Sequence, residues 1–273
     1  MNITLQEKQN QTINPEKSGI FSKYFTKLKV GSILNRSGIV KTKGASPLEI
    51  FTIVFNLAFI GKNFYEGVVR NKHITIGKDA VYNFLNSSNY NWRRFTILLF
   101  VKIYSIITKL LDSSSEEVLI IDDSPYERNR SKKVELLSKV YDHVQNKYIK
   151  GFRMLTLSWS DGNTCLGIDF ELLSSTKGRN RYQDINSAID KRTCGYSRRK
   201  GSLTKSTELL EPMVTRAIKA GVRAKYLLMD SWFSMPSVIE RLRKHLHIIC
   251  MLKDQPKWLY EYKGSKLRLG LRI

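Results

Sequence analysis

Two segments of the sequence place carboxylates directly after a short apolar run. Residues 118–121 lead into Asp122 and Asp123, and residues 225–229 lead into Asp230. Apolar runs of this length are typical of central strands that are buried on both faces. If two such strands lie side by side and parallel, roughly 4.8 Å apart, their terminal acids converge at one edge of the sheet. The result would be an all-oxygen pocket that suits Mg²⁺ or Mn²⁺.

Such a pocket has a specific chemical use. Two divalent cations about 3.5–4 Å apart activate an attacking water or hydroxyl and stabilise the leaving oxygen during phosphodiester displacement. An aspartate after a strand is also a common turn or helix-capping residue, and Asp122-Asp123-Ser124-Pro125 is good turn chemistry. Acids after two strands of one basic chain nevertheless favour metal binding over that ordinary role.

The charge balance indicates what the substrate is. Lys and Arg number 46 against 24 acids, a formal net charge of +22, which favours a polyanionic partner such as nucleic acid. The apolar runs 50–60 and 95–107 are too short to span a membrane, and the polar N-terminus has no apolar signal core. We therefore expect no membrane partner and a bacterial-type cytoplasmic, nucleoid-associated location.

The N-terminal part of the chain has a helical pattern. Residues 1–30 are polar and without a clear period, which predicts a flexible arm, and residues 31–113 predict an all-helical DNA-binding domain. Ser46-Pro47-Leu48-Glu49 is typical of a helix start. The one-sided helix predicted at 78–85, with Lys78 at its beginning, suits the reading element of a helix-turn-helix. Any small helical bundle would show a similar pattern.

The remaining residues change to a strand period. Strands are expected at 118–121, 152–160 and 164–173, the latter two joined by the hairpin signal Ser160-Asp161-Gly162-Asn163. Residues 132–148 have apolar side chains near helical spacing. A helix at 207–220, a strand at 225–229, a helix at 236–244 and a strand at 247–252 follow. An antiparallel unit followed by two helix–strand units predicts an α/β, RNase H-like mixed sheet after the all-helical N-terminal domain.

Three motifs over residues 118–254 together resemble insertion-sequence transposases of the DDE type, from the branch whose third motif is Tyr-Arg-Glu-Lys. They are Asp122-Asp123-Ser124 after the first strand, Tyr148-Ile149-Lys150-Gly151-Phe152 at the start of the hairpin, and Asp230-Ser231-Trp232-Phe233 after the later strand. Trp232 stands where that family's pattern has glycine. The resemblance assigns residues 118–254 as an RNase H-like catalytic core.

The resemblance also implies site residues, cofactor and partners. Asp123, which a hydroxyl residue follows, and Asp230 would be the catalytic, metal-binding acids, with Asp122 as the alternate. The cofactor would be Mg²⁺ or Mn²⁺, the substrate double-stranded DNA at the terminal repeats of an insertion sequence, and the assembly a homodimer. Residues 255–273 match only the start of the family's β insertion, which precedes its catalytic Glu. The resemblance thus implies a truncated transposase that is inactive alone.

The loop 174–206 is strongly basic and lies between the third strand and the first core helix. We expect it to contact DNA phosphates, although a solvated loop would have the same composition. The residues expected to do so are Lys177, Arg179, Arg181, Arg198, Arg199 and Lys200.

Two other functions fit parts of the pattern. A chain that only binds DNA could be a remnant of a transposase, or an inhibitor of an intact one. An RNase H-like nuclease that acts on RNA hybrids would share the core, but the helical N-terminal domain fits that function less well.

Overall fold

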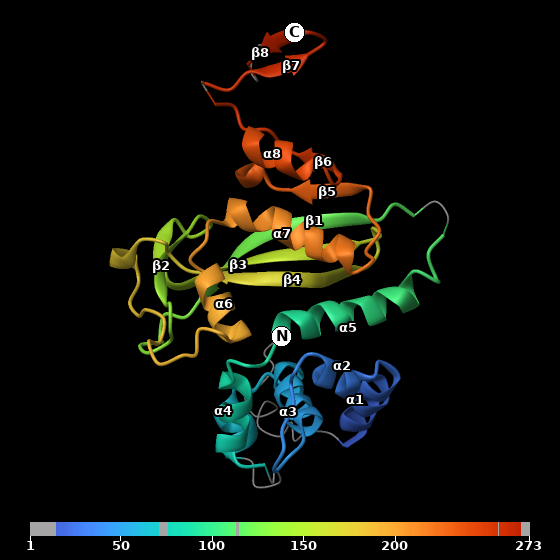
Figure 1. Cartoon of the computed structure of the whole chain (residues 1–273), viewed down its shortest axis with the longest axis vertical. Coiled ribbons are helices and arrows are strands. Elements are labelled where there is room, and N and C mark those ends of the chain that lie inside the picture. Colours follow the sequence, from blue (N-terminus) through green and yellow to red (C-terminus); the bar gives the residue numbers. More distant parts are fainter. Residues whose placement is uncertain (1–14, 71–75, 113–114, 256, 269–273) are drawn as a thin grey trace, which may run out of the picture. The chain divides into compact units, whose positions relative to one another are not determined.

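The computed structural model describes residues 15–70, 76–112, 115–255 and 257–268. The chain forms two compact units: residues 1–103 together with 190–196, and residues 104–189 together with 197–273 (Figure 1). The first unit therefore includes a short segment from within the basic loop. Among the described residues, no helix has the length and apolar character needed to cross a bilayer.

The N-terminal unit is helical, as predicted. Its elements are α1 (Pro15–Lys27), α2 (Val30–Arg36), α3 (Pro47–Phe59), a π-helical turn (Tyr65–Val69), α4 (Lys78–Asn86) and most of α5 (Trp92–Ile107). The start of α3 is the one that the sequence predicts. Ser46 Oγ accepts from Glu49 N at 3.3 Å, and Glu49 Oε2 accepts from Ser46 N at 2.7 Å, so the two residues form a capping box.

The core of this unit differs from the prediction in one respect. Pro15–Lys27 is a helix, and Phe25 packs in the core with Ile50, Val81 and Phe84. Within the part of the expected 1–30 arm that the structure describes, the chain is therefore helical rather than a flexible arm, because Phe25 buries an aromatic face. Residues 1–14 lie outside the described residues.

The C-terminal unit is built on one mixed sheet. The strands are β1 (Val118–Glu127), β2 (Ser138–Asp142), β3 (Lys147–Ser160), β4 (Cys165–Leu173), β5 (Tyr226–Met229) and β6 (His247–Cys250). β3 is antiparallel to both β1 and β4, whereas β1, β5 and β6 are parallel neighbours in that order. This is the RNase H-like arrangement predicted from the element order, with the first strand beside the fourth of that core.

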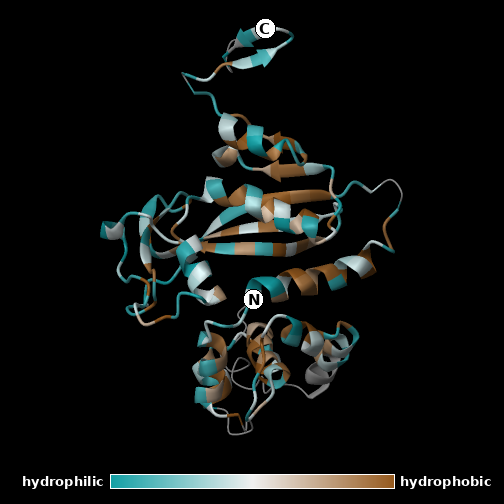
Figure 2. Ribbon diagram, in the orientation of Figure 1, coloured by the Kyte–Doolittle hydropathy of each residue, from teal (hydrophilic) through white to brown (hydrophobic). Residues whose placement is uncertain are grey.

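Helices connect and cover these strands. α6 (Cys194–Gly201) and α7 (Ser206–Lys219) lie between β4 and β5 in the chain, and α8 (Pro236–Leu242) lies between β5 and β6. α7 contacts β3 and β4, and its buried side chains are Leu210, Met213, Val214 and Ala217. The brown, hydrophobic colour of Figure 2 lies in the middle of the sheet, whereas β2 is mostly teal. Short 3₁₀ turns occur at Gly178–Asn180 and Ser231–Phe233, and a hairpin pairs β7 (Tyr260–Tyr262) with β8 (Ser265–Leu267).

The helical spacing noted at residues 132–148 was misleading. The segment contains β2 and a turn, in which Asn146 has a φ of 49°. β2 pairs with Lys147–Gly151 of β3, and β4 pairs with the same strand from Arg153 onward. The end of β3 beyond β4 would otherwise leave its backbone groups unpaired, so tertiary pairing overrides the local pattern.

Candidate active site

The pairing of β1 with β5 fixes where the predicted acids lie. Ile121 is opposite Met229, so Asp122 and Asp230 follow at the same level on adjacent parallel strands. Asp230 has an extended backbone, with φ −67° and ψ 157°, and thus continues the line of β5. Parallel neighbours at one level have their side chains on the same face of the sheet. Continuing this register by one residue leads us to expect Asp122 and Asp230 on the same face of the sheet.

Asp123 lies on the other face, because successive side chains of a strand alternate. That face also carries Leu119 and Ile121, which are almost completely buried. The Asp123 carboxylate is 9% exposed and forms an ion pair with Arg153 of β3. Arg153 Nη2 donates to Oδ1 at 2.7 Å, and Arg153 Nε is 2.7 Å from Oδ2. A cation thus already neutralises Asp123 from within the chain.

Asp122 and Asp230 are both exposed and keep oxygen atoms for a ligand. Ser124 Oγ donates to Asp122 Oδ2 at 3.4 Å, and Thr156 Oγ1 donates to the Asp122 carbonyl at 3.2 Å. Asp230 Oδ1 accepts from Ser231 N and so caps the 3₁₀ turn that follows. Asp123 as the partner of Asp230, with Asp122 as the alternate, stays a prediction, and the exposure of Asp122 and the ion pair of Asp123 are arguments for Asp122.

These donors fit a hard divalent cation. Carboxylate oxygens are the ligands that Mg²⁺ and Mn²⁺ prefer, and both acids are exposed. Over the residues that the structure describes, no cluster of three or more His, Cys, Asp or Glu side chains is arranged for a metal. The site thus offers two protein carboxylates, and Glu261 lies in the separate β7–β8 hairpin.

The motif glycine at the start of the hairpin has a structural role. A Cβ on Gly151 would lie 2.1 Å from the Tyr126 carbonyl oxygen of β1, which no side chain could tolerate. Absence of a side chain lets β3 approach the outer part of β1, where Arg128 N donates to the Lys150 carbonyl at 2.7 Å. Gly151 therefore helps to hold the segment that carries the acids.

Comparison with known proteins assigns the chain to a family. A family model described as DDE superfamily endonuclease matches residues 63–257. The chain belongs to the DDE superfamily endonuclease family. The resemblance found in its motifs is thereby confirmed. A search of curated proteins found no match to this chain.

One solved structure to which the chain is similar is the Drosophila P element transposase strand transfer complex. The two chains are 9% identical, with a TM-score of 0.29. The match covers 92% of this chain and 53% of the other, so the chain spans about half the length of that transposase.

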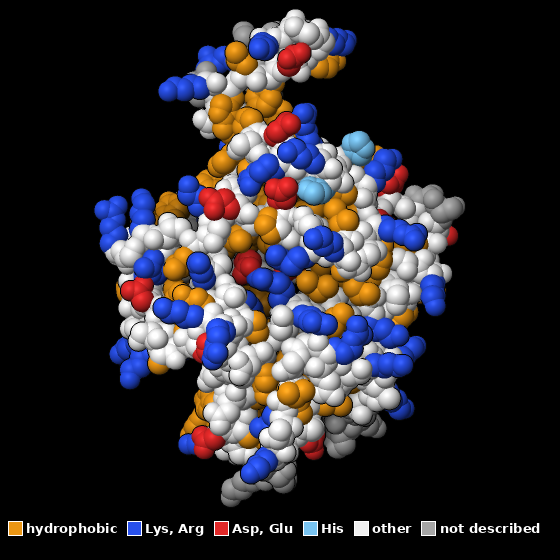
Figure 3. Space-filling view, in the orientation of Figure 1, with side chains coloured by type: hydrophobic (Ala, Val, Ile, Leu, Met, Phe, Trp, Pro, Cys, Tyr) orange, Lys and Arg blue, Asp and Glu red, His pale blue; other side chains and the backbone are white. Residues whose placement is uncertain are grey.

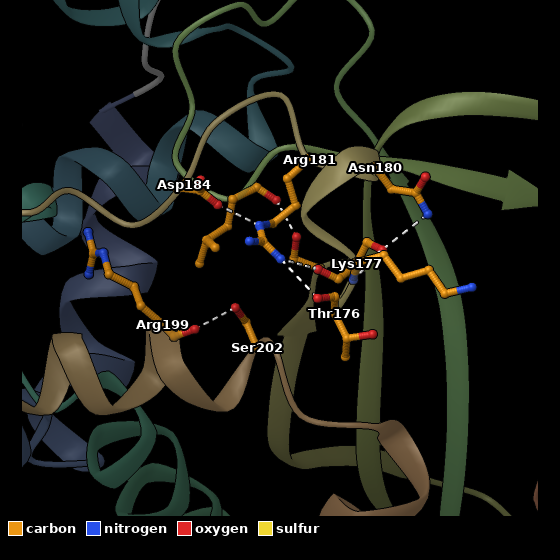
Figure 4. Close-up of polar contacts among 10 residues, drawn as sticks. Thr176, Lys177, Asn180, Arg181, Asp184, Arg199 and Ser202 are labelled. Carbon is orange, nitrogen blue, oxygen red and sulfur yellow. Dashed lines mark hydrogen bonds and ion pairs between the residues drawn. The ribbon is translucent and has the colours of Figure 1, made fainter.

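Part of the basic loop 174–206 is held by internal contacts (Figure 4). Arg181 donates from Nε to Asp184 at 2.6 Å and from Nη1 to the Ser175 and Thr176 carbonyls at 2.9 and 3.2 Å. Its side chain is only 15% exposed. Arg181 therefore fixes the loop, and its predicted contact with phosphate stays a prediction.

The other predicted DNA-binding cations divide into two groups. Arg198 lies over the Phe170 ring, with Cζ 5.0 Å from its centroid, and Arg199 pairs with Glu135. Lys177, Arg179 and Lys200 are exposed, and Lys78 is exposed at the start of α4 in the N-terminal unit. On the face shown in Figure 3, basic side chains clearly outnumber acidic ones, as the net charge requires.

Sequence reasoning missed Arg153 and the aromatic side chains near it. Arg153 is two residues after the motif glycine Gly151, in a strand whose alternate residues Leu155 and Leu157 are buried. An arginine on the same face of a strand as buried leucines indicates a carboxylate partner that is also buried. That signal could have distinguished Asp123 from Asp122.

Proposed function

We propose that this endonuclease is a transposase-type DNA nuclease that cleaves and rejoins strands at the ends of an insertion sequence. Asp122 and Asp230 are its metal-binding acids. The observation that carries the proposal is their position at one level and on one face of the parallel pair β1 and β5. The family assignment and the net charge of +22 support a DNA substrate.

The site would hold Mg²⁺ or Mn²⁺ between the Asp122 and Asp230 carboxylates. When bound, such an ion supplies an activated oxygen nucleophile and stabilises the leaving oxygen of a phosphodiester. Asp123 and Arg153 act as positioning residues, because their ion pair fixes the part of β1 that carries Asp122. In the absence of a cation, Asp122 and Asp230 repel each other.

The exposed cations hold the DNA in this proposal. Lys177, Arg179 and Lys200 contact phosphates from the C-terminal unit, and Lys78 does so from the helical unit. The substrate is duplex DNA with terminal inverted repeats, the working assembly is a homodimer, and the site of action is the bacterial-type nucleoid. These finer assignments come from the resemblance in the motifs.

This chain alone is expected to bind DNA without cleaving it at a useful rate. The described residues hold no cluster of three or more His, Cys, Asp or Glu side chains that could bind a metal, whereas the resemblance implies three acids. If the metal ion lacks one carboxylate ligand, the attacking oxygen is poorly positioned and poorly activated. A function limited to DNA binding, including inhibition of an intact transposase, is thus the second candidate.

The metal response of the purified chain tests the proposed site. Binding to the native state raises the melting temperature, so MgCl₂ or MnCl₂ should stabilise the wild-type chain relative to EDTA. Asp122→Asn and Asp230→Asn should abolish that shift, and each should raise the melting temperature in EDTA by relieving repulsion. The matched control Asp161→Asn, in the β3–β4 turn, should keep the full response. A full response in Asp230→Asn would overturn the assignment.

A nicking assay on supercoiled plasmid separates the two candidate functions. The chain is expected to shift the plasmid in a gel without relaxing it. Metal-dependent nicking that disappears in Asp122→Asn would show that the chain is an active nuclease with a third acid still to be found. Failure to bind DNA at low salt would contradict both functions.

A further inference from the structure

A continuous row of aromatic rings lies on the surface of the C-terminal unit. Tyr148 contacts Tyr141 with ring centroids 5.1 Å apart, Tyr141 contacts His143 at 4.9 Å, and His143 contacts Trp232 at 6.0 Å. The rings come from β2, the turn after it, β3 and the 3₁₀ turn after β5. We call these four residues the aromatic track.

The rings of the track are exposed. Tyr148 is 61% exposed, Tyr141 36% and Trp232 41%, and His143 is also exposed. Aromatic side chains bury large apolar areas when they can, and single exposed ones are common. Four exposed rings in mutual contact, drawn from separate segments, are instead typical of a binding surface.

Cations lie over the rings at both ends of the track. Lys139 Nζ is 4.2 Å from the Tyr148 centroid, and Lys253 Nζ is 4.4 Å from the Trp232 centroid. Between Lys139 and Tyr148 the one carboxylate is that of Asp142. It is buried and accepts from the backbone N–H groups of the turn that follows. The surface thus combines π faces with positive charge.

The track begins next to the candidate active site. Trp232 is two residues after Asp230, at the position where the family motif has glycine. Arg153, which pairs with Asp123, has Cζ 5.9 Å from the Trp232 centroid. From there the track leads away from the carboxylates towards Tyr148 in β3.

We propose that the aromatic track binds the unpaired bases of a single DNA strand whose phosphodiester lies at Asp122 and Asp230. In duplex DNA the faces of the bases are stacked on each other, so only unpaired bases can stack on protein rings. Rings flanked by lysines are the combination that single-strand binding uses, because the lysines contact phosphates between the bases. The inference rests on the proposed nuclease function for the choice of DNA and for its orientation.

Binding by the full chain to two labelled DNAs tests the track. One is a blunt duplex, and the other is the same duplex with a single-stranded 3′ extension of about six nucleotides, within the range of known single-strand sites. Fluorescence anisotropy in EDTA removes any contribution from metal. The wild-type chain should bind the extended duplex more tightly than the blunt one.

Substitutions then identify the residues responsible. Trp232→Ala and Tyr148→Ala should each weaken binding to the extended duplex by roughly 5- to 150-fold and leave blunt-duplex binding unchanged. Both side chains are exposed, so the fold should survive, which circular dichroism would check. The matched control is Tyr262→Ala, a ring 57% exposed with Lys263 Nζ 5.2 Å from its centroid but with no part in the track.

The outcomes separate this inference from the proposed function. Equal weakening for both DNAs, or no weakening in either variant, would overturn the track as a base-binding surface, and a protein would then be its natural partner. If Trp232→Ala and Tyr148→Ala lose their preference for the extended duplex while the wild-type chain shows no metal response, the track is supported and the nuclease assignment is contradicted. A metal response in a chain whose binding to the extended duplex does not depend on Trp232 or Tyr148 would support the metal site and overturn the track.

Discussion

The ion pair between Asp123 and Arg153 gives the sharpest test of the site's geometry. Two N–O distances of 2.7 Å join a carboxylate that is 9% exposed to a guanidinium that is 27% exposed. Removal of one partner from a buried pair costs about 3–5 kcal/mol, whereas an exposed pair contributes about 0–1 kcal/mol. Because the Arg153 side is partly hydrated, we expect Arg153→Met to lower the free energy of unfolding by about 2–3 kcal/mol.

The second partner should behave differently. Asp123→Asn keeps an acceptor for Arg153 and removes the buried charge, so its cost should be about 1–2 kcal/mol. The double variant Asp123→Asn/Arg153→Met should be less destabilised than the sum of the two, since the single changes remove the same interaction. Urea unfolding at neutral pH in EDTA measures all three values.

The metal response of these variants decides which aspartate binds the ion. Asp123→Asn should keep the melting-temperature increase with MgCl₂, because Asp123 is on the opposite face from Asp230. If Asp123→Asn loses the increase while Asp122→Asn keeps it, the assignment by faces is wrong. A change below about 0.5 kcal/mol for Arg153→Met would contradict the argument from burial.

Three further changes have expected outcomes. Gly151→Ala should lower the free energy of unfolding by more than about 2 kcal/mol, because its Cβ would overlap the Tyr126 carbonyl. The control Gly167→Ala in β4, where a Cβ meets nothing within 4 Å, should cost about 1 kcal/mol or less. Urea unfolding measures both values. Burial and a hydrogen bond to Glu117 raise the pKa of Tyr104 to about 12, so its stabilisation is complete below pH 10, its ordinary pKa, and is lost as the pH rises towards 12. Unfolding measured from pH 9 to 11.5 should thus show a shallower decline in Tyr104→Phe than in the wild type, and parallel curves would contradict this. Replacement of Lys177, Arg179 and Lys200 by Gln should flatten the plot of log affinity for duplex DNA against log salt by about 0.9 per lost phosphate contact, and an unchanged slope would return the loop to a solvated role.

The sequence predicted the order of elements well because the relevant signals are local. The capping box at Ser46 and the Asp161-Gly162 hairpin depend on neighbouring residues, and Gly162 has the φ of 91° that such a turn needs. The helix predicted at 207–220 ends likewise before Gly221, which has a φ of 90°. These features determined the RNase H-like topology without knowledge of tertiary contacts.

The details of the site depend on information that is not local. A strand buried on both faces has no polar–apolar alternation, so residues 118–121 do not reveal which of Asp122 and Asp123 shares a face with Asp230. The choice follows only from the register of β1 with β5 and from Arg153 on β3. β2 was not predicted for the same reason, because it forms only by pairing with Lys147–Gly151 of β3.

The pairing of β1 with β5 also has a consequence for how the protein is made. Val118 pairs with Tyr226, so the strands that carry the two acids are brought together by one of the most distant contacts in the chain. The β1–β3–β4 meander can form on the ribosome as soon as Leu173 has emerged, but β5 closes a long loop and joins later. Until then the apolar edge of β1 is open to other chains, which makes the nascent protein prone to aggregation. The two strands that lead into Asp122 and Asp230 are consequently brought together late in synthesis.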